Sequence, residues 1–433
     1  MPVTRIICPR FFKCTYGAIA AVTVLLSACS DRSRENPFDP RNPETQGRPT
    51  GTAVISVLDT IRVSWQPMAL RDLTGYTVYR KLAGEPDFSP LAEISARSNH
   101  YEDRSHRFGI LHQYRVVVKV GAEVSPPSDE VAITPGPTIA WLADVNDGTL
   151  VKLTHDGRHE LLRTFAFPAP ERVKIDARRG NVWVLDEFTG RLGRVNFSGA
   201  DKQIFDDFVQ PVDLVLDGED GSIWVADSLE RSLRRYDAGG VLAAQNDSLP
   251  KLAAFALNPF YHEMWAISAD GLELLRLSKQ AALVQRVPLP VAVGDDPIDL
   301  EVHAATGSAW LSLRRRVVLL NAEGRFLQAS TYAFRKALRL AVDQNSGECW
   351  VIDETLQYRQ SRVLKLDLQG AVAYQFEGLD RPQSLAVNPF DSSCYVTDSL
   401  RGRVVRISKE GELQTVFAGL ITPVDIDIAN LLQ

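Results

Sequence analysis

Histidine, cysteine and methionine are scarce in this chain of 433 residues, which has seven His, five Cys and three Met. Few histidines leave few candidates for acid–base or metal chemistry, and no nucleophile elbow, metalloprotease helix motif or phosphate-binding glycine loop occurs. An excess of positive charge is also missing, because the formal net charge is −6. Nucleic-acid-binding proteins usually present a strongly basic domain, so the composition argues against that class. The length instead indicates two or three globular domains.

The only apolar run near the N-terminus, residues 18–26, is too short to cross a bilayer as a mature helix. Three basic residues precede it, Arg5, Arg10 and Lys13, and this order is typical of an export signal. The run ends in Leu26-Ser27-Ala28-Cys29, which resembles the bacterial lipobox. The resemblance implies that residues 1–28 are a lipoprotein signal peptide and that the Cys29 thiol is acylated, which anchors the protein to a membrane. A plain secretory signal with a chance cysteine is the alternative.

Residues 29–48 are rich in Pro, Asn, Asp, Arg and Glu and have hardly an apolar side chain. Such a segment buries too little surface to offset its ordering entropy, so we expect a flexible tether. Ser30, directly after the lipid-bearing Cys29, carries no negative charge. This favours the outer membrane if the cell envelope has two membranes.

Residues 49–135 alternate between apolar and polar positions in short runs that are separated by turn residues, which predicts a β-sandwich. The runs 61–65, 76–80 and 114–118, with Trp65 as a core anchor, resemble a fibronectin type III domain. We expect a rigid spacer here and keep a binding module as the alternative.

From residue 138 onward an aromatic residue recurs every 40 to 45 positions, a period typical of a β-propeller. The series is Trp141, Trp183, Trp224, Trp265, Trp310, Trp350 and Tyr395. An Asp follows three residues later in five units, and a basic residue and a glycine turn follow further on. A residue repeated in every unit serves the scaffold, so we interpret the Asp and basic residues as cross-strand ion pairs.

An apolar strand precedes every aromatic residue of the series except the first. Residues 423–428 at the chain end repeat the Pro-x-Asp pattern of residues 211–214 and 297–300. The C-terminal strand is therefore predicted to complete the first blade and close the ring. This predicts an all-β chain in which a sandwich precedes a seven-bladed β-propeller over residues 138–433, with six blades as the alternative. The units 224–229 and 395–400 resemble NHL repeats.

Function is expected where the repeat is broken. Arg314 and Arg315 replace the Asp-bearing turn of the fifth unit, and a longer loop in the sixth carries Tyr358 and Arg359. Three carboxylates are expected at the mouth of the central channel on the same face: Asp213, Asp299 and Asp425. Such a cluster is able to hold Ca²⁺, but carboxylates after proline also cap backbone amides, which we favour. No catalytic residue is assigned.

These residues predict a membrane-anchored extracytoplasmic binding or scaffold protein whose propeller face contacts a protein, peptide or glycan. The alternative is a Ca²⁺-dependent hydrolase or lyase, because the NHL resemblance extends to propellers of the gluconolactonase and streptogramin-lyase type. A histidine converging with several oxygen ligands in the channel would favour the enzyme. Cys349 and Cys394 stand at equivalent repeat positions and are expected to be buried free thiols.

Overall fold

A computed structural model describes residues 35–165, 167–186, 188–290, 295–355 and 361–432. Within these ranges the regular secondary structure is β-strand throughout, apart from one 3₁₀ turn at Ser399–Arg401. No helix in the described part of the chain is long and apolar enough to cross a membrane. Cys29, Tyr358 and Arg359 lie outside the described residues.

The segment before the first strand is more ordered than its composition predicts. Its described residues, 35–48, form consecutive turns in which the Asn42 side chain is buried and accepts hydrogen bonds from the N–H groups of Glu44 and Thr45. The Thr45 hydroxyl donates to the carbonyl of Pro37 at 2.6 Å. Asn and Thr side chains thus satisfy the backbone in place of an apolar core. These hydrogen bonds hold the described part of residues 29–48 in a series of turns.

Two sheets follow. One has the order β1-β2-β5 and the other β4-β3-β6-β7, with β8 also paired to β6. The strands are β1 (Ala53–Val57), β2 (Thr60–Ser64), β3 (Leu73–Leu82), β4 (Ser89–Ser95), β5 (His100–Asp103), β6 (His112–Val120), β7 (Glu123–Val124) and β8 (Val131–Ile133). Trp65, directly after β2, is buried and packs against Tyr76 of β3 with ring centroids 5.1 Å apart. Trp65 is thus the core anchor that the sequence indicated.

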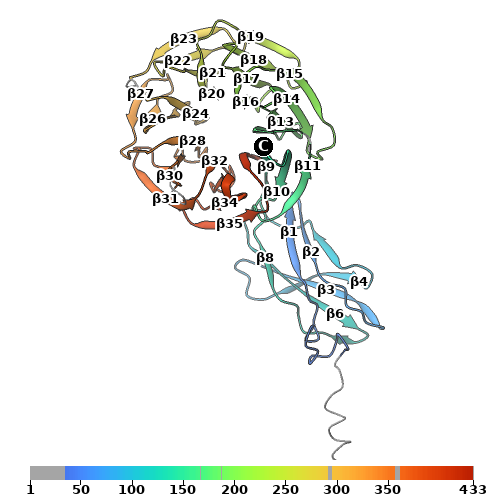
Figure 1. Cartoon of the computed structure of the whole chain (residues 1–433). Coiled ribbons are helices and arrows are strands. Elements are labelled where there is room, and N and C mark those ends of the chain that lie inside the picture. Colours follow the sequence, from blue (N-terminus) through green and yellow to red (C-terminus); the bar gives the residue numbers. More distant parts are fainter. Residues whose placement is uncertain (1–34, 166, 187, 291–294, 356–360, 433) are drawn as a thin grey trace, which may run out of the picture. The chain divides into compact units, whose positions relative to one another are not determined.

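The rest of the chain forms four-stranded antiparallel sheets arranged around a central axis, which is a β-propeller (Figure 1). Among the described residues there are seven such sheets, numbered here in chain order and each given from its innermost to its outermost strand. They are β36 (Pro423–Asn430), β9 (Thr138–Asp144), β10 (Thr149–Leu153) and β11 (Glu160–Thr164); β12 (Arg172–Asp176), β13 (Asn181–Asp186), β14 (Arg191–Asn196) and β15 (Gln203–Asp207); β16 (Pro211–Leu216), β17 (Ile223–Asp227), β18 (Ser232–Tyr236) and β19 (Leu242–Asn246); β20 (Leu252–Asn258), β21 (Glu263–Ser268), β22 (Glu273–Leu277) and β23 (Leu283–Pro288); β24 (Pro297–Val302), β25 (Ala309–Leu313), β26 (Arg316–Leu320) and β27 (Phe326–Ala329); β28 (Ala337–Val342), β29 (Cys349–Asp353), β30 (Ser361–Leu366) and β31 (Val372–Leu379); and β32 (Pro382–Val387), β33 (Cys394–Asp398), β34 (Arg403–Ile407) and β35 (Leu413–Ala418).

The C-terminal strand closes the ring. β36 is the innermost strand of the first sheet and pairs antiparallel with β9, with Asp427 opposite Trp141 and Asp425 opposite Ala143. The pairing confirms the prediction that the chain end completes the first unit of the repeat.

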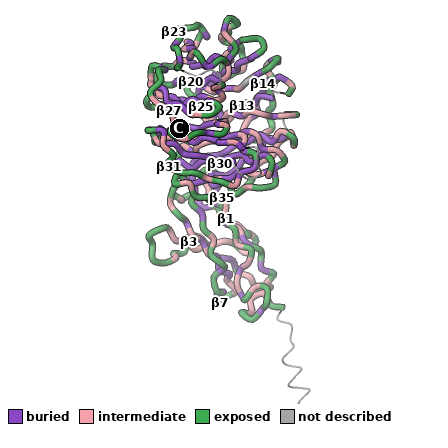
Figure 2. Tube along the Cα trace, turned by 60° about the vertical axis from the view of Figure 1, so that its left-hand side comes forward, coloured by how far each residue is buried: buried purple, intermediate pink, exposed green. Residues whose placement is uncertain are grey.

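Apolar side chains fill every interface between neighbouring sheets. The repeated aromatic residue of each second strand is buried, and it packs with apolar residues of the next sheet. Figure 2 shows the resulting pattern, with buried residues along the middle strands of the sheets and exposed ones on the outermost strands and turns. Cys349 and Cys394 are buried free thiols in this core, as predicted.

The repeated Asp and basic residues do not pair with each other in any of the described sheets, so that interpretation was wrong. The basic residue lies directly opposite the aromatic one, as Arg194 does opposite Trp183, and its guanidinium lies 5.1 Å from the Trp183 ring centroid. Asp186 follows Trp183 by three positions, and residues an odd number apart on a strand point to opposite faces. The basic side chain and the Asp therefore cannot meet on one face of the sheet.

Candidate functional site

The repeated Asp side chains fix the loops on one face of the propeller. Asp227 accepts hydrogen bonds from Val209 and Gln210 in the link to the preceding sheet, and from Leu229 and Glu230 in the turn between β17 and β18. Asp144, Asp186, Asp353 and Asp398 bind the corresponding link in their own sheets. The links between sheets and the turns between second and third strands therefore share one face, which we call the link face. These aspartates serve the scaffold.

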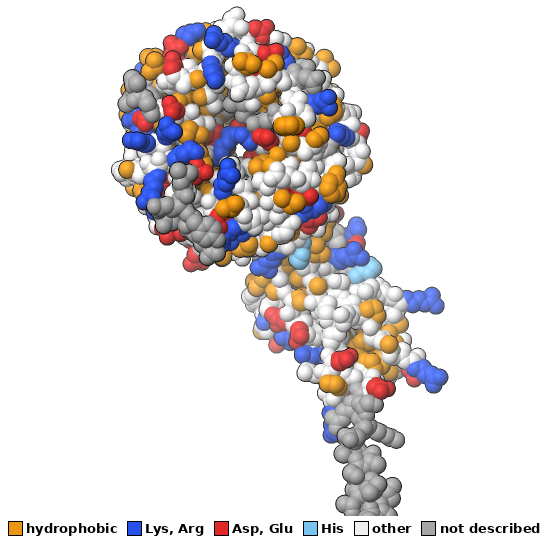
Figure 3. Space-filling view, in the orientation of Figure 1, with side chains coloured by type: hydrophobic (Ala, Val, Ile, Leu, Met, Phe, Trp, Pro, Cys, Tyr) orange, Lys and Arg blue, Asp and Glu red, His pale blue; other side chains and the backbone are white. Residues whose placement is uncertain are grey.

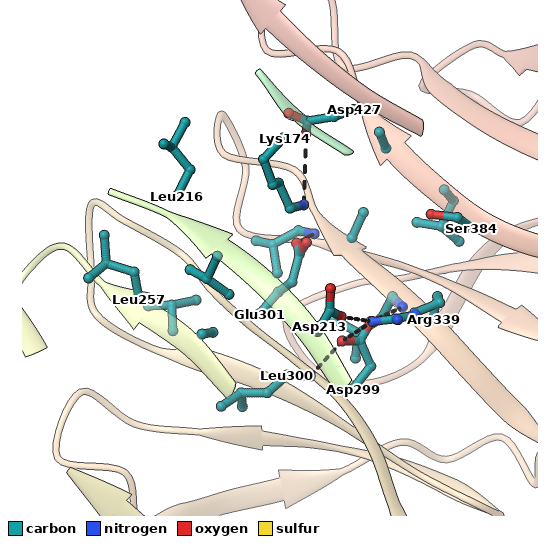
Figure 4. A pocket seen from close by; sticks show the side chains of 18 of the residues that line it. Lys174, Asp213, Leu216, Leu257, Asp299, Leu300, Glu301, Arg339, Ser384 and Asp427 are labelled. Atoms are coloured by element: carbon teal, nitrogen blue, oxygen red, sulfur yellow. Dashed lines mark hydrogen bonds and ion pairs between the residues drawn. The ribbon is translucent and has the colours of Figure 1, made fainter. Parts of the chain in front are cut away.

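The three predicted channel carboxylates do lie together. Asp213, Asp299 and Asp425 stand on β16, β24 and β36 and line one central cavity of about 520 Å³ (Figure 4). Arg339 of β28 reaches across the channel and contacts both Asp213 and Asp299, the latter at 3.3 Å. Arg172 of β12 lies 3.5 Å from Asp213. These groups form a bridge of ion pairs across the channel.

Asp425 is held by hydrogen bonds from neighbouring sheets. Its carboxylate accepts hydrogen bonds from the Val173 backbone of the next sheet and from the Ser384 hydroxyl. Asp299 likewise accepts from the Leu340 backbone N–H of the next sheet. The open edge of an inner strand has unpaired N–H groups, and these carboxylates satisfy some of them. The backbone-capping interpretation of the sequence thus matches the geometry.

The arrangement does not fit Ca²⁺. The space between Asp213 and Asp299 is taken by the Arg339 guanidinium, and Asp425 is used by Ser384 and the backbone. Calcium requires six to eight converging oxygen ligands. Across the described residues, no group of three or more His, Cys, Asp or Glu side chains is placed to hold a metal ion. We derive no chemistry through calcium at this site.

Charge and burial perturb several pKa values in the cavity. Burial would raise the pKa of Asp213, but Arg339 and Arg172 outweigh it and lower that pKa to about 2. Burial raises the pKa of Glu301 to about 7, although Lys174 opposes the shift. Burial also raises the pKa values of Asp299 and Asp427. Asp213 is therefore a firmly ionised partner of the arginines, whereas Glu301 is poised near neutral pH.

The histidines of the propeller lie away from these carboxylates. His303 follows β24 at the opposite end of the inner strand and contacts Thr306 and Gln344. His155 lies in the turn after β10, with Thr138 at 2.6 Å. None of the cavity-lining residues is a histidine within the described ranges. The convergence that would favour the enzyme alternative does not form among them.

The link face has a cationic patch where the sequence placed two arginines. Arg314 and Arg315 form the tight turn between β25 and β26 and are exposed, and Arg335 is exposed in the next link. Arg314 lies 3.5 Å from Asp296, an exposed and therefore weak ion pair. In Figure 3, Lys and Arg side chains gather over the sheets of β24 to β31.

The same face has an exposed apolar arc that sequence reasoning missed. Phe188 is 83% exposed and Phe165 is 76% exposed, both in loops of the link face. The arc comprises Phe165, Phe188, Val209, Leu229, Leu272, Leu400 and Ile421. Figure 3 shows hydrophobic side chains over the sheets of β12 to β19, away from the cationic patch. A signal was present, because Phe188, Leu229 and Leu400 each stand two positions after the repeated Asp, where a solvent-facing turn would carry a polar residue.

Comparison of the sequence with family models and with curated proteins gave no match. Solved structures do match. A candidate 6-phosphogluconolactonase from Bacteroides uniformis has a TM-score of 0.56 at 11% identity, over 67% of this chain and 99% of that one. A similarly described protein from Bacteroides fragilis has a TM-score of 0.54 at 13% identity, over 67% and 98%. A protein of unknown function from Desulfotomaculum acetoxidans has 0.55 at 12%, over 67% and 99%. Likeness at this identity shows the β-propeller fold and no activity.

Proposed function

We propose that this chain is a lipid-anchored extracytoplasmic binding protein, in which a seven-bladed NHL-like propeller follows a fibronectin type III-like domain. Seven four-stranded sheets support the blade count, and the two N-terminal sheets around Trp65 support the fibronectin type III assignment. The lipobox ending in Cys29 supports the anchor.

The composition of the link face carries the binding function. Large apolar patches on a soluble protein mark interaction surfaces, and aromatic residues and arginine are enriched where partners bind most strongly. The apolar arc and the cationic patch share this face, and hydrogen bonds to Asp227 hold the loops of Val209 and Leu229 in place. The occupant is a protein of the cell envelope that presents apolar side chains together with acidic ones.

Two pairs of substitutions test the face. Phe188→Ser with Leu229→Ser should weaken capture of the partner from envelope extracts at least about tenfold, because these side chains lose their apolar contact area. Arg314→Ser with Arg315→Ser should weaken it and also reduce its dependence on salt. Val241→Ser with Leu368→Ser is the matched control, since both residues are exposed in turns on the opposite side of the propeller. Equal loss in the control pair would move the site off the link face.

The anchor has its own test. Cys29→Ala removes the thiol that would be acylated, so the variant should leave the detergent phase and accumulate as a soluble or uncleaved form. Detergent-phase partitioning of the protein from cells grown with radiolabelled palmitate measures this. Partitioning equal to that of the unchanged chain would refute the lipoprotein assignment and leave a plain secretory signal.

A further inference from the structure

One row of residues around the central channel has an uneven distribution of charge. In each sheet a single residue of the innermost strand lies directly opposite the repeated aromatic residue. From the first sheet to the seventh these are Asp427, Lys174, Val215, Ala256, Glu301, Ala341 and Ala386. Four of the seven are small and apolar, so they leave space that longer side chains would fill. All seven line the cavity of about 520 Å³, a volume typical of small-molecule sites.

Glu301 is the charged residue of this row that forms no ion pair within 4.0 Å with any described residue. Its neighbours in the row are Ala256 and Ala341, which offer no partner. One carboxylate oxygen, Oε2, accepts from the Val342 backbone at 2.8 Å, and Oε1 accepts no hydrogen bond from any described residue. Lys174 is paired with Asp427 instead, at 3.9 Å (Figure 4). The free oxygen of Glu301 is therefore available to a ligand.

The whole cavity has more carboxylates than cations. Its lining has five acidic residues (Asp213, Asp299, Glu301, Asp425 and Asp427) and three basic ones (Arg172, Lys174 and Arg339). Arg339 and Arg172 are engaged with Asp213 and Asp299, as described above. A cationic ligand would offset the remaining negative charge, whereas an anionic one would add to it.

The chamber is the part of the cavity lined by this row of seven residues. We propose that the chamber binds a small organic amine, whose ammonium group donates to Glu301 while its carbon chain lies against Ala256, Ala341 and Ala386. The ion-pair bridge around Arg339 separates the chamber from the link face. The cavity extends instead to Gly218, Pro259 and Gln344, which lie in the turns between first and second strands, at the end of the propeller opposite the link face. The amine enters from that end, and its binding does not depend on the partner site of the link face.

Binding should depend on pH. The groups that face Glu301 are Asp299 on its own strand, Arg339 on β28, Cys349 on β29, Lys174 and Arg172 on β12, Asp213 on β16, and Asp425 and Asp427 on β36. Burial, together with Asp299 and Asp427, raises the pKa of Glu301, and Lys174 and the Val342 N–H oppose this, so that the pKa is about 7. Alkylammonium groups stay protonated at that pH, so affinity should follow ionisation of Glu301. The affinity should rise about tenfold from pH 6 to pH 8.

Three ligands of matched shape, n-butylamine, butyrate and 1-butanol, test the proposal by ligand-observed NMR titration of the full-length protein. We expect saturable binding of butylamine, stronger at pH 8 than at pH 6, and no binding of butyrate or butanol. Glu301→Gln keeps an acceptor for the Val342 N–H but loses the charge. It should therefore weaken butylamine binding at least about tenfold and abolish the pH dependence of that binding. Glu323→Gln, an exposed site elsewhere, is the control and should change neither.

Ala386→Leu provides a second variant, because it fills the chamber and leaves Glu301 in place. It should weaken butylamine binding, and the residual binding should keep its pH dependence. Butyrate binding as strong as butylamine, or unchanged butylamine binding by Glu301→Gln, would overturn the proposal. Phe188→Ser with Leu229→Ser should leave butylamine binding intact, so failure of the chamber and failure of the link face are distinguishable.

Discussion

At the scale of the residue, the repeated aspartates show how one side chain fixes two loops. Asp227 is buried and accepts four backbone N–H groups, two from the link and two from the turn. Hydrogen bonds to an ionised acceptor are stronger than neutral ones, and a buried N–H without a partner is costly. The Asp227 carboxylate thus supplies the acceptors that a paired strand would supply elsewhere, both in the link before β16 and in the turn between β17 and β18.

Asp227→Ala should therefore lower the free energy of unfolding by about 2 to 4 kcal/mol, because four backbone N–H groups lose a charged acceptor at once. Urea denaturation followed by Trp fluorescence measures the change. Asp201→Ala, at an exposed position, is the control and should alter stability by less than about 0.5 kcal/mol. An equal effect of the two substitutions would show that the loops do not need the carboxylate.

Sequence reasoning reached some of the channel residues and missed others for a definite reason. Asp213, Asp299 and Asp425 share a position after proline in the repeat, so their common location in the ring was predictable. Arg339 was missed because its strand reads as an ordinary apolar one, and its partner Asp213 lies 126 residues earlier. Glu301 and Lys174 were missed for the same reason. Periodicity places a residue on a strand, but only closure of the ring shows which residues meet across the channel.

At the scale of the element, the C-terminal strand β36 is the piece on which the first sheet depends. It pairs along β9 from Pro423 to Asn430, and Ile426 is buried against the seventh sheet. Asp425 and Asp427 of the same strand accept hydrogen bonds from Val173 and Ile175 of the second sheet. One strand thus connects three neighbouring sheets. Its Pro-x-Asp pattern, which other inner strands share, is what made it recognisable in the sequence.

Deleting residues 422–433 should cost several kcal/mol, because β9 becomes an open edge and the apolar side chains of β36 leave the core. The melting temperature by circular dichroism should fall accordingly, and the truncated chain should aggregate on heating. Deleting only Leu432 and Gln433, beyond the strand, is the control and should leave melting unchanged. If both truncations melt like the full chain, β36 does not close the ring.

At the scale of the whole molecule, each apolar core of the propeller is shared by two neighbouring sheets. Trp183 of the second sheet packs with Leu214 of the third, and Tyr395 of the seventh packs with Leu142 of the first. The sequence predicted this ring from its period alone, because repeats that cannot bury an apolar face by themselves must stack on neighbours. It could not predict the charge in the channel, since each inner strand there contributes a different residue to one shared space.

A closed ring of shared cores should unfold as one unit, unlike an open repeat array, in which units unfold nearly independently of distant ones. Ile426→Ala in the first sheet and Leu364→Ala in the sixth each remove buried apolar contacts, and each should cost about 2 to 5 kcal/mol. Both substitutions should shift the same unfolding transition, because losing one sheet takes an interface from each of its two neighbours and opens the ring. Hydrogen exchange followed by mass spectrometry, read separately for β13, β21 and β33, measures this: the protection of all three strands should fall together in either variant. Loss of protection confined to the substituted sheet and its two neighbours would show that the ring opens locally, as an array does.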